Sequence, residues 1–462
     1  MDRLDRQLRL WGGFGHELLT SSQICFIVER DDDPLLLEVQ RHLLLAGISR
    51  YLVFHSDRRH PPSRDGFAFI NEKEELQSLN PEIKPHWDFL PWSRIRTQSF
   101  KDTSVIVLIN CGNTHVLQEL SNKREKCRTF PPVLVTVVHY PLAYTYLWLK
   151  EIHFVVTTNP EYVVPDLRIN EPWDELFQYV ESLDFCKMRE EELAEIPYPL
   201  ILSKALRETS QDERPLHQKL DDYFLKYSAQ ALNDPNYRQA KRYARQVNRT
   251  SELGRQRAQQ LLSRLERYQC LNWHDFFNDR LMALCQAVGH FLNKYHQLPL
   301  PSEFPDMEAG TQIYNDLKMI YQRKAQEDCR TMEVILAQLG YPDFPKWLAE
   351  KFCDNINDWI LLEPDVSEPS MPGIYSGKAL RRYVSEKEKI IPENEKKILG
   401  VLARFSRDSY DTNTLASFFP ATAFLGGVAA QEVVKLVTHQ YIPIDNTFVY
   451  DFISDESITI RL

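Results

Sequence analysis

The first turn that could do chemistry follows the apolar run ICFIV at residues 24–28 and reads ERDDDP at residues 29–34. In nucleotide-binding strand–turn–helix units, glycines here let the backbone approach the phosphates, whose charge then lies at the helix N-terminus. No glycine occurs between Gly15 and Gly47 of this chain. Three carboxylates would satisfy the helix dipole, and each would repel a triphosphate by roughly 1 kcal/mol even in water. We therefore expect a charged cap on a solvated turn at a place that has lost its phosphate chemistry.

A second pattern that looks like a phosphate-binding loop is GIYSGKA at residues 373–379. It is one residue short between its glycines, Ala379 stands where Ser or Thr should follow Lys378, and no strand precedes it. We expect an ordinary loop. The eight cysteines include no C-x-x-C pair, so we also expect structural thiols rather than a zinc or redox site.

The strongest charge bias lies between Arg238 and Arg267, a stretch that contains nine basic residues and only two acidic ones, Glu252 and Glu266. Such runs usually form a solvated helical face, which is the interpretation we prefer. Contact with an acidic protein stays open. Nucleic acid ranks last because no aromatic residues are interleaved for base stacking.

The elements around the first turn predict a doubly wound α/β domain with a mostly parallel sheet. Asp33 is a candidate N-cap, Pro34 suits the first helical turn, and Gly47 can end the helix. The expected helix is 34–46, and the expected buried strands are 24–28, 51–54, 105–109 and 133–138.

The middle of the chain differs from the first part in glycine content and in the periodicity of its apolar residues. From Asp174 to Pro372 only four glycines occur and helical periodicity dominates, which predicts a mostly helical insertion. Residues 423–438 then read as a small-residue helix and 447–453 as a strand that re-enters the first sheet. We expect residues 1–173 to form the first part of an α/β domain, 174–400 the inserted domain and 401–462 the return.

Bulk properties set limits on partners and location. The chain has 462 residues, 43% of them hydrophobic and 26% charged, with a formal net charge of −10. The acidic balance argues against a nucleic-acid-binding protein. The charged N-terminus does not look like a signal peptide and no run approaches 18 apolar residues, so we expect no membrane association and a cytoplasmic or nuclear protein.

Three segments carry a more specific signal: DRQLRLWG at 5–12, FPATAFLGGVAAQEVVK at 419–435 and IPIDNTFVY at 442–450. They resemble the opening and closing signatures of the ubiquitin-like-protein-activating enzymes. Within that family, the chain is most similar to the regulatory subunits of neddylation-activating enzymes, a match also supported by 159–160, 165–168, 298–300, 305–307 and 321–325. Leu4 stands where the family often has tyrosine, a departure that concerns packing.

The resemblance implies a Rossmann-like pseudo-adenylation domain in a heterodimer. The catalytic partner would hold ATP and magnesium, adenylate the C-terminal glycine of a ubiquitin-like modifier and form the thioester, while this chain binds no cofactor. Family members reach across the interface with the arginine found here as Arg6, a fixed cation suited to phosphate oxygens. Arg9, Trp11, Gly426 and Gly427 are candidate interface residues, although a salt bridge for Arg9 and packing within the chain for the other three stay open.

Other functions remain as alternatives. The chain could be a non-catalytic scaffold or adaptor, or the regulatory subunit of the sumoylation-activating enzyme, which shares the N-terminal signature but has a shorter insertion. A stand-alone nucleotide-dependent oxidoreductase is disfavoured by the missing glycines.

Overall fold

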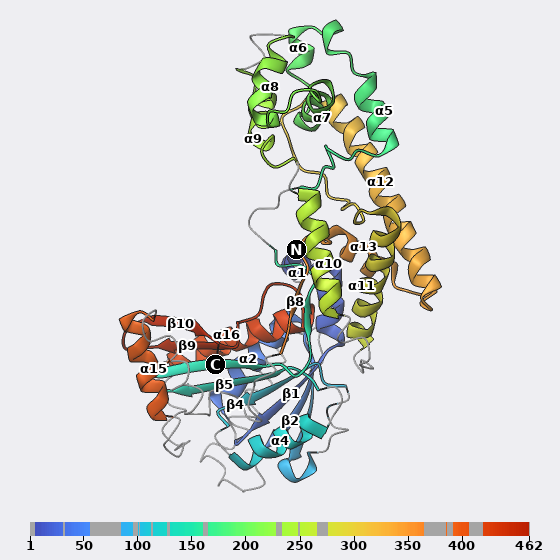
Figure 1. The fold of residues 1–462 in the computed structure, drawn as a ribbon. Helices are drawn as coiled ribbons and strands as arrows, with labels where there is room; N and C mark the ends of the chain where they lie inside the picture. The colour runs from blue at the N-terminus through green and yellow to red at the C-terminus, as the bar shows by residue number, and fades with distance from the viewer. Residues whose placement is uncertain are drawn as a thin grey trace. The chain divides into compact units, whose positions relative to one another are not determined.

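The computed structural model describes residues 5–30, 33–55, 85–95, 100, 102–111, 114–126, 130–159, 165–227, 233–247, 250–265, 276–364, 385, 391–405 and 419–461. The chain forms two compact units (Figure 1). The first comprises Met1–Asn159, Cys270–Asp279 and Ile360–Leu462, and the second comprises Pro160–Gln269 and Arg280–Trp359. The domain limits expected from the sequence, at 173 and 400, stay predictions.

An eight-stranded sheet forms the centre of the first unit, in the order β10-β9-β6-β5-β4-β1-β2-β3. The strands from β3 to β5 in this order pair in parallel, and β6, β9 and β10 continue the sheet in antiparallel pairs. Their bounds are β1 Gln23–Val28, β2 Arg50–His55, β3 His86–Pro91, β4 Val105–Ile109, β5 Val133–His139, β6 Leu142–Trp148, β9 Thr447–Asp451 and β10 Glu456–Ile460. This arrangement confirms the predicted α/β fold with a mostly parallel sheet.

Helices cover both faces of the sheet, which explains the continuous apolar runs in the central strands. On β1, Cys25 and Ile27 contribute to one core, while Ile24, Phe26 and Val28 contribute to the other. The first core includes apolar residues of α4 (Thr114–Lys126) and α15 (Glu393–Phe405). The second includes residues of α1 (Asp5–Ser21), α2 (Pro34–Ala46) and α16 (Phe419–Thr438).

Helix α2 has the limits and the caps that the sequence predicts. The Asp33 carboxyl accepts a hydrogen bond from the amide of Leu35 at 2.8 Å, and Pro34 occupies the first turn. At the other end Gly47 adopts φ 106°, ψ 0°, and its N–H donates to the carbonyls of Leu43 and Leu44. A positive φ of this kind is the reason that glycine is favoured after a helix.

The C-terminal segment returns to the first sheet, as predicted. Strand β9 pairs with β6 in antiparallel register, with Tyr144 opposite Val449, and it ends at Asp451, earlier than expected. Where the chain leaves and rejoins the first unit, β7 (His153–Val155) and β8 (Ile360–Leu362) form a two-stranded antiparallel sheet.

In the described residues of the second unit the regular secondary structure is helical, as the helical periodicity of the sequence predicts. Its core contains fully buried side chains such as Leu200, Tyr223, Phe224 and Leu317. The helices are α5 Asp174–Ser182, α6 Glu190–Leu193, α7 Tyr198–Glu208, α8 Leu216–Phe224, α9 Pro235–Tyr243, α10 Thr250–Leu265, α11 Phe276–Tyr295, α12 Thr311–Gln338 and α13 Lys346–Asp354. Residues 276–279 of α11 belong to the first unit. Among the helices that the structure describes, none has the length and apolar character needed to cross a bilayer.

Candidate functional site

The candidate site lies at the carboxyl ends of β1 and β4, where the strand order reverses and α/β sheets bind ligands. Asp33, at the N-terminus of α2, is 8% exposed. Its carboxyl accepts from Leu35 and also from the side-chain amide of Asn110, with Nδ2 3.1 Å from Oδ1 and 3.0 Å from Oδ2. Burial raises the pKa of Asp33, an effect that the hydrogen bonds from Asn110, Leu35 and Leu36 and the charge of Arg30 oppose.

Asn110 ties this carboxyl to the next strand. It follows β4 in a left-handed conformation, with φ 44°, which asparagine tolerates better than most residues. Its side-chain Oδ1 accepts from the backbone N–H of Val138 on β5 at 2.9 Å. The backbone N–H of Asn110 donates to the carbonyl of Thr136 at 3.0 Å. One asparagine therefore connects the α2 N-terminus with β5.

These contacts decide what the site can hold. The α2 N-terminus is the place where a phosphate would be bound by backbone amides and the helix dipole. A buried carboxyl already accepts those donors, so the residues present do not fit a nucleotide phosphate. The sequence anticipated Asp33 as a cap, but on a solvated turn, whereas its side chain is buried and bonded to Asn110. Asn110 was missed, although an asparagine directly after the buried strand 105–109 was the available signal. Asp31 and Asp32 lie outside the described residues.

Helix α1 carries three of the predicted site residues. Arg6 belongs to this helix, but its side chain is outside the described part of the structure, and Arg9 is exposed. Trp11 is only 6% exposed; its ring packs edge-on against Tyr441 with centroids 5.7 Å apart, and its carbonyl accepts from Gln440. Trp11 thus helps to fix α1 against the segment that follows α16. Its role in a subunit interface stays a prediction.

The two glycines predicted at an interface differ in their surroundings. A Cβ on Gly426 would lie 2.7 Å from Cβ of Glu38 in α2, so this glycine allows the close approach of two helices of the same chain. A Cβ on Gly427 would meet only Nε2 of His42, at an ordinary 3.7 Å. Nearby, the buried Glu432 accepts from Lys435 at 2.6 Å and from the amide of Ile444 at 2.8 Å. The interface role of both glycines remains untested.

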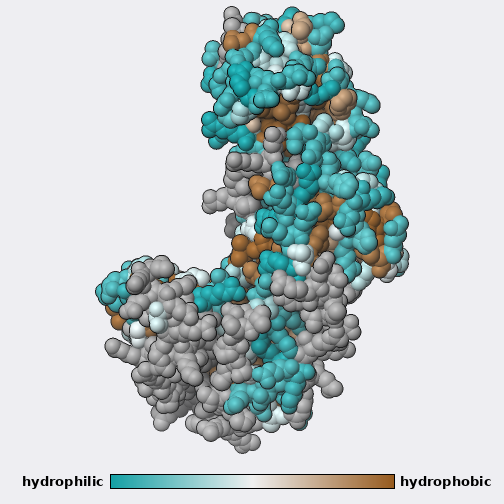
Figure 2. All heavy atoms as spheres, viewed as in Figure 1, coloured by the Kyte–Doolittle hydropathy of each residue, from teal (hydrophilic) through white to brown (hydrophobic). Residues whose placement is uncertain are grey.

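The basic stretch predicted between Arg238 and Arg267 is partly engaged within the second unit. Lys241 pairs with Asp221 at 2.7 Å, and Arg257 donates to the carbonyl of Asn357 at 3.1 Å. The face of this unit seen in Figure 2 is mostly hydrophilic, with scattered hydrophobic patches. Internal pairing therefore accounts for part of the charge bias. Arg249 and Arg267 lie outside the described residues.

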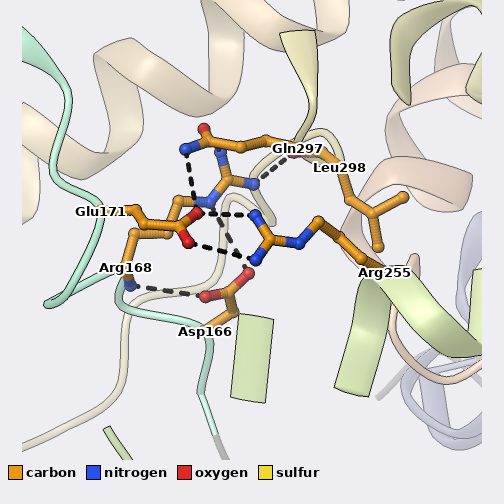
Figure 3. Close-up of a pocket in the computed structure, with 6 residues that line it drawn as sticks. All are labelled: Asp166, Arg168, Glu171, Arg255, Gln297 and Leu298. Carbon is orange, nitrogen blue, oxygen red and sulfur yellow. Dashed lines mark hydrogen bonds and ion pairs between the residues drawn. The ribbon is translucent and has the colours of Figure 1, made fainter. Parts of the chain in front are cut away.

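A pocket in the second unit is lined by paired charges (Figure 3). Arg255 of α10 makes two hydrogen bonds to Glu171, at 2.7 and 3.1 Å. Arg168 is 3% exposed, lies 3.6 Å from Asp166 and donates to Gln297 at 2.8 Å. Since each charged side chain of this lining faces one of opposite sign, the arrangement joins chain segments and offers no single-sign site for a ligand.

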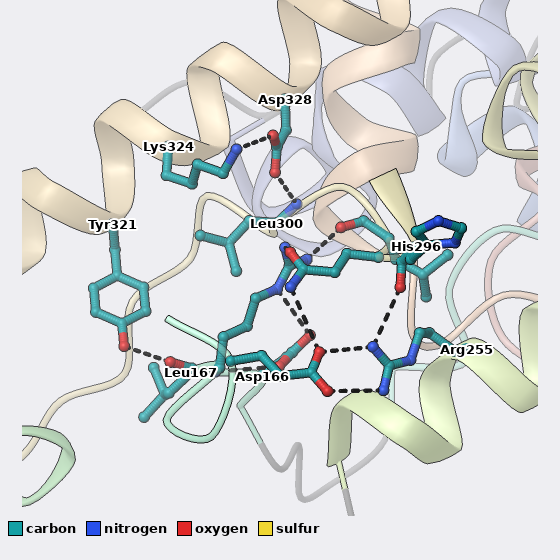
Figure 4. A network of polar contacts seen from close by, with 12 residues as sticks. Asp166, Leu167, Arg255, His296, Leu300, Tyr321, Lys324 and Asp328 are labelled. Carbon is teal, nitrogen blue, oxygen red and sulfur yellow. Dashed lines mark hydrogen bonds and ion pairs between the residues drawn. The ribbon is translucent and has the colours of Figure 1, made fainter. Parts of the chain in front are cut away.

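The same network reaches α12 (Figure 4). The Tyr321 hydroxyl donates to the carbonyl of Leu167 at 2.5 Å. Asp328 accepts from the amide of Leu300 at 3.0 Å and from Lys324 at 2.8 Å. Three of the segments singled out by the sequence, 165–168, 298–300 and 321–325, thus meet around one cluster, which gives their composition a structural reason.

The cysteines in the described residues have the surroundings of structural thiols, with one exposed exception, Cys186. Burial raises the pKa of Cys25 and Cys285. A hydrogen bond between Cys329 and Cys353 lowers the pKa of the first thiol and raises that of the second. No group of three or more potential metal ligands occurs within the part of the chain that the structure describes. The 373–379 loop and two of the eight cysteines lie outside it.

Comparisons with known proteins identify the family. No protein-family model matches the chain. A NEDD8-activating enzyme E1 regulatory subunit of Saccharomyces cerevisiae is 30% identical over an alignment of 494 positions that covers all of both chains. The chain belongs to the NEDD8-activating enzyme E1 regulatory subunits. Relatives with the same function in their names include AXL of Arabidopsis thaliana and a Drosophila melanogaster protein, each 24% identical and covering 100% of this chain.

Membership of this family places the chain in the neddylation pathway and disfavours the alternative of a sumoylation-activating enzyme subunit. The relatives and the chain have nearly the same extent, since the aligned regions cover 99% of the Arabidopsis protein and 97% of the Drosophila one. Among solved structures, a complex titled E. coli MccB + MccA-N7isoASN is 12% identical with a TM-score of 0.26, covering 40% of this chain and 57% of that one, too low to carry an argument.

Proposed function

We propose that this chain is the non-catalytic subunit of a heterodimer whose partner binds ATP and magnesium and activates a ubiquitin-like modifier. The observation that carries the proposal is the Asp33–Asn110 contact. In a chain belonging to the NEDD8-activating enzyme E1 regulatory subunits, the buried Asp33 carboxyl, held by Asn110, accepts the backbone amide of Leu35 at the helix N-terminus where a nucleotide phosphate would bind. Chemistry that needs ATP must then take place on the other subunit.

Within this proposal, Arg6 contributes a cation to the phosphates held by the partner. It lies in the first turn of α1, which Trp11 fixes to the rest of the first unit through Tyr441 and Gln440. Gly12 breaks α1 with φ 68° and ψ 173°, so Trp11 ends the short helical part that contains Arg6 and attaches it to the first unit. A guanidinium there would stabilise phosphate charge through fixed, bidentate hydrogen bonds.

The test is ATP–pyrophosphate exchange by the chain co-expressed with its cognate catalytic subunit and modifier. We expect the chain alone to bind no ATP and to show no exchange, and the complex to show both. Arg6→Ala should lower exchange by at least about tenfold with the heterodimer intact, as loss of a phosphate-contacting arginine does. Arg6→Lys should recover part of the activity, because lysine keeps the charge but not the bidentate geometry.

Arg94→Ala is the control, since Arg94 is an exposed arginine of the first unit. It should leave exchange close to the wild-type value. Full exchange by Arg6→Ala would instead support the scaffold alternative. Binding of ATP by the isolated chain would contradict the proposal.

A further inference from the structure

The segment that directly follows α16, residues 439–441, has an unusual backbone. His439 and Tyr441 both lie in the left-handed region, with φ 54° and 60°, on either side of Gln440. This region is unfavourable for residues that carry a Cβ, and such conformations persist only where surrounding contacts impose them, often near functional sites. The contacts that hold residues 439–441 therefore indicate what the segment does.

Backbone hydrogen bonds attach this segment to the residues that follow β7. The N–H of Val156 donates to the carbonyl of His439, and the N–H of Tyr441 donates to the carbonyl of Thr157, both at 2.8 Å. These bonds lie on either side of Gln440, so the backbone that carries its side chain is held from both directions.

The side chain of Gln440 connects the segment with α1. It is 3% exposed, and its Nε2 donates to the carbonyl of Trp11 at 2.8 Å. Trp11 is the last residue before the break at Gly12. The last carbonyls of a helix have no donor within the helix. Gln440 supplies a donor at the point where the first helical part of α1 ends.

Gly15 permits this close contact. A Cβ at its position would lie 2.8 Å from Cβ of Trp11 and 3.0 Å from Nε2 of Gln440. In an unbroken helix, Cβ atoms four residues apart are about 5–6 Å from each other, so the break at Gly12 folds Trp11 back over the next turn. The Trp11 ring also packs edge-on against Tyr441. The end of the short helical part is thus fixed by a hydrogen bond, a ring contact and a glycine that admits both.

We propose that Gln440 is a positioning residue for Arg6, and that it sets the direction in which the short helical part of α1 offers this arginine to the phosphates on the catalytic subunit. The inference rests on the proposed function, since it assumes that Arg6 contacts those phosphates. It adds the residue of the first unit through which that contact is oriented.

The length of the helical part explains why its attachment matters. Arg6 precedes Trp11 by five residues, which is about 7.5 Å along a helix. A tilt of about 10° at Trp11 would therefore move the backbone of Arg6 by about 1 Å. Displacements of that size from a reacting geometry can lower a rate by up to about a hundredfold. The strained and doubly attached segment around Gln440 resists such a tilt.

The test is a double-mutant cycle in ATP–pyrophosphate exchange, measured with the full-length chain and saturating catalytic subunit so that heterodimer formation does not limit the rate. Gln440→Met keeps the length of the side chain but removes the donor. It should lower exchange by about tenfold in the wild-type background. In an Arg6→Ala background it should lower exchange by less than about twofold, because orientation has no effect once the oriented cation is absent.

Asn236→Leu is the matched control. Asn236 is a buried amide side chain, 1% exposed, that donates to the carbonyls of Leu193 and Ile196 in the second unit. Its replacement removes a comparable side-chain donor at a place remote in sequence from α1, and exchange at a temperature where the variant is folded should stay within about twofold of the wild-type value.

A second variant probes the same contact from the other side. If Gln440→Met does not fold, Gly15→Ala replaces it, since the added methyl group would push Nε2 of Gln440 away from Trp11 while alanine favours the helix. Gly15→Ala should show the same dependence on the Arg6 background.

The outcomes separate this inference from the function on which it rests. An equal loss in both backgrounds would show that Gln440 supports the first unit without acting through Arg6, and it would overturn the inference. Wild-type exchange by the folded Gln440→Met variant would overturn it as well. Both results leave the proposed function in place as long as Arg6→Ala alone lowers exchange. Full exchange by Arg6→Ala would remove the role of Arg6 and this inference together.

Discussion

The side-chain amide of Asn110 lies 3.1 and 3.0 Å from the two carboxyl oxygens of Asp33, although 77 residues separate them. This contact joins the start of α2 to the end of β4 at the point where related folds bind nucleotides. Because the same carboxyl also caps α2, it combines a helix cap with a link between strand ends.

Asp33→Ala should destabilise the first unit by about 2–4 kcal/mol, since it removes a helix cap and leaves the Asn110 amide buried without its acceptor. Urea unfolding measures the loss. Asp184 is the control: it accepts an equivalent hydrogen bond from the residue two positions on, Cys186, but it is exposed. Asp184→Ala should therefore cost clearly less than Asp33→Ala, and equal losses for the two variants would contradict this role of Asp33.

Gly426→Ala and Gly427→Ala should act in opposite directions. A methyl group at 426 would lie 2.7 Å from Cβ of Glu38 and 3.4 Å from its carbonyl carbon, so α2 and α16 would have to separate, at about 1–3 kcal/mol. At 427 the nearest atom is 3.7 Å away, and the helix should gain up to about 1 kcal/mol from alanine. Melting temperatures of the two variants are the measurement, and the reverse order would disprove the close contact.

His153 should make the first unit acid-sensitive. Its ring stacks on His439 with centroids 4.6 Å apart, and burial together with the charge of His439 lowers its pKa well below 6.5. The folded state thus keeps His153 neutral while the unfolded chain protonates near pH 6.5. The stability that this difference contributes is complete above pH 6.5 and falls, by up to about 1.4 kcal/mol per pH unit, as the pH drops towards the folded pKa.

His153→Phe tests this expectation through the pH dependence of the free energy of unfolding. The variant should lose less stability than the wild type between pH 6.5 and pH 5, because phenylalanine keeps a stacked ring that does not titrate. His86, whose side chain is 72% exposed, supplies the control substitution His86→Phe, which should leave the wild-type slope. Identical slopes for the wild type and His153→Phe would rule out the buried histidine as the source.

The ionised Glu171 side chain should stabilise the second unit at pH values above those at which it takes up a proton. The hydrogen bonds from Arg255 lower its pKa from 4.5, so its contribution is present above pH 4.5 and is lost as the pH falls through the folded pKa. Glu171→Gln should cost about 1 kcal/mol at pH 7 in urea unfolding. Glu175→Gln, which removes the more exposed pair with Arg323, should cost less, and no difference between the two variants would contradict the prediction.

Local signals in the sequence predicted much of the first unit. Asp33, Pro34 and Gly47 specify the limits of α2 because caps act through neighbouring backbone groups, which the sequence itself contains. The strands 24–28 and 105–109 are recognisable because burial on both faces demands unbroken apolar runs. The family resemblance supplied the pathway, and the relatives confirm it.

Relationships between distant segments were less accessible. Asn110 acts on Asp33 only because β1 and β4 pair, and the sequence near either residue does not state this pairing. Likewise, whether Gly426 or Gly427 meets α2 depends on the rotation of α16 against it. Strand β6 was not anticipated either, although it follows β5 directly and pairs with it; its other neighbour, β9, comes from the far end of the chain.

The Asp33–Asn110 contact also bears on the evolutionary history open to this chain. A return to nucleotide binding would require glycines in the turn, and the first such substitution at position 33 would remove a buried cap before any affinity was gained. Net stabilities of domains are only about 5–15 kcal/mol, so that intermediate would be selected against. Under the proposed function, a division of labour between two subunits would then be difficult to reverse by single mutations.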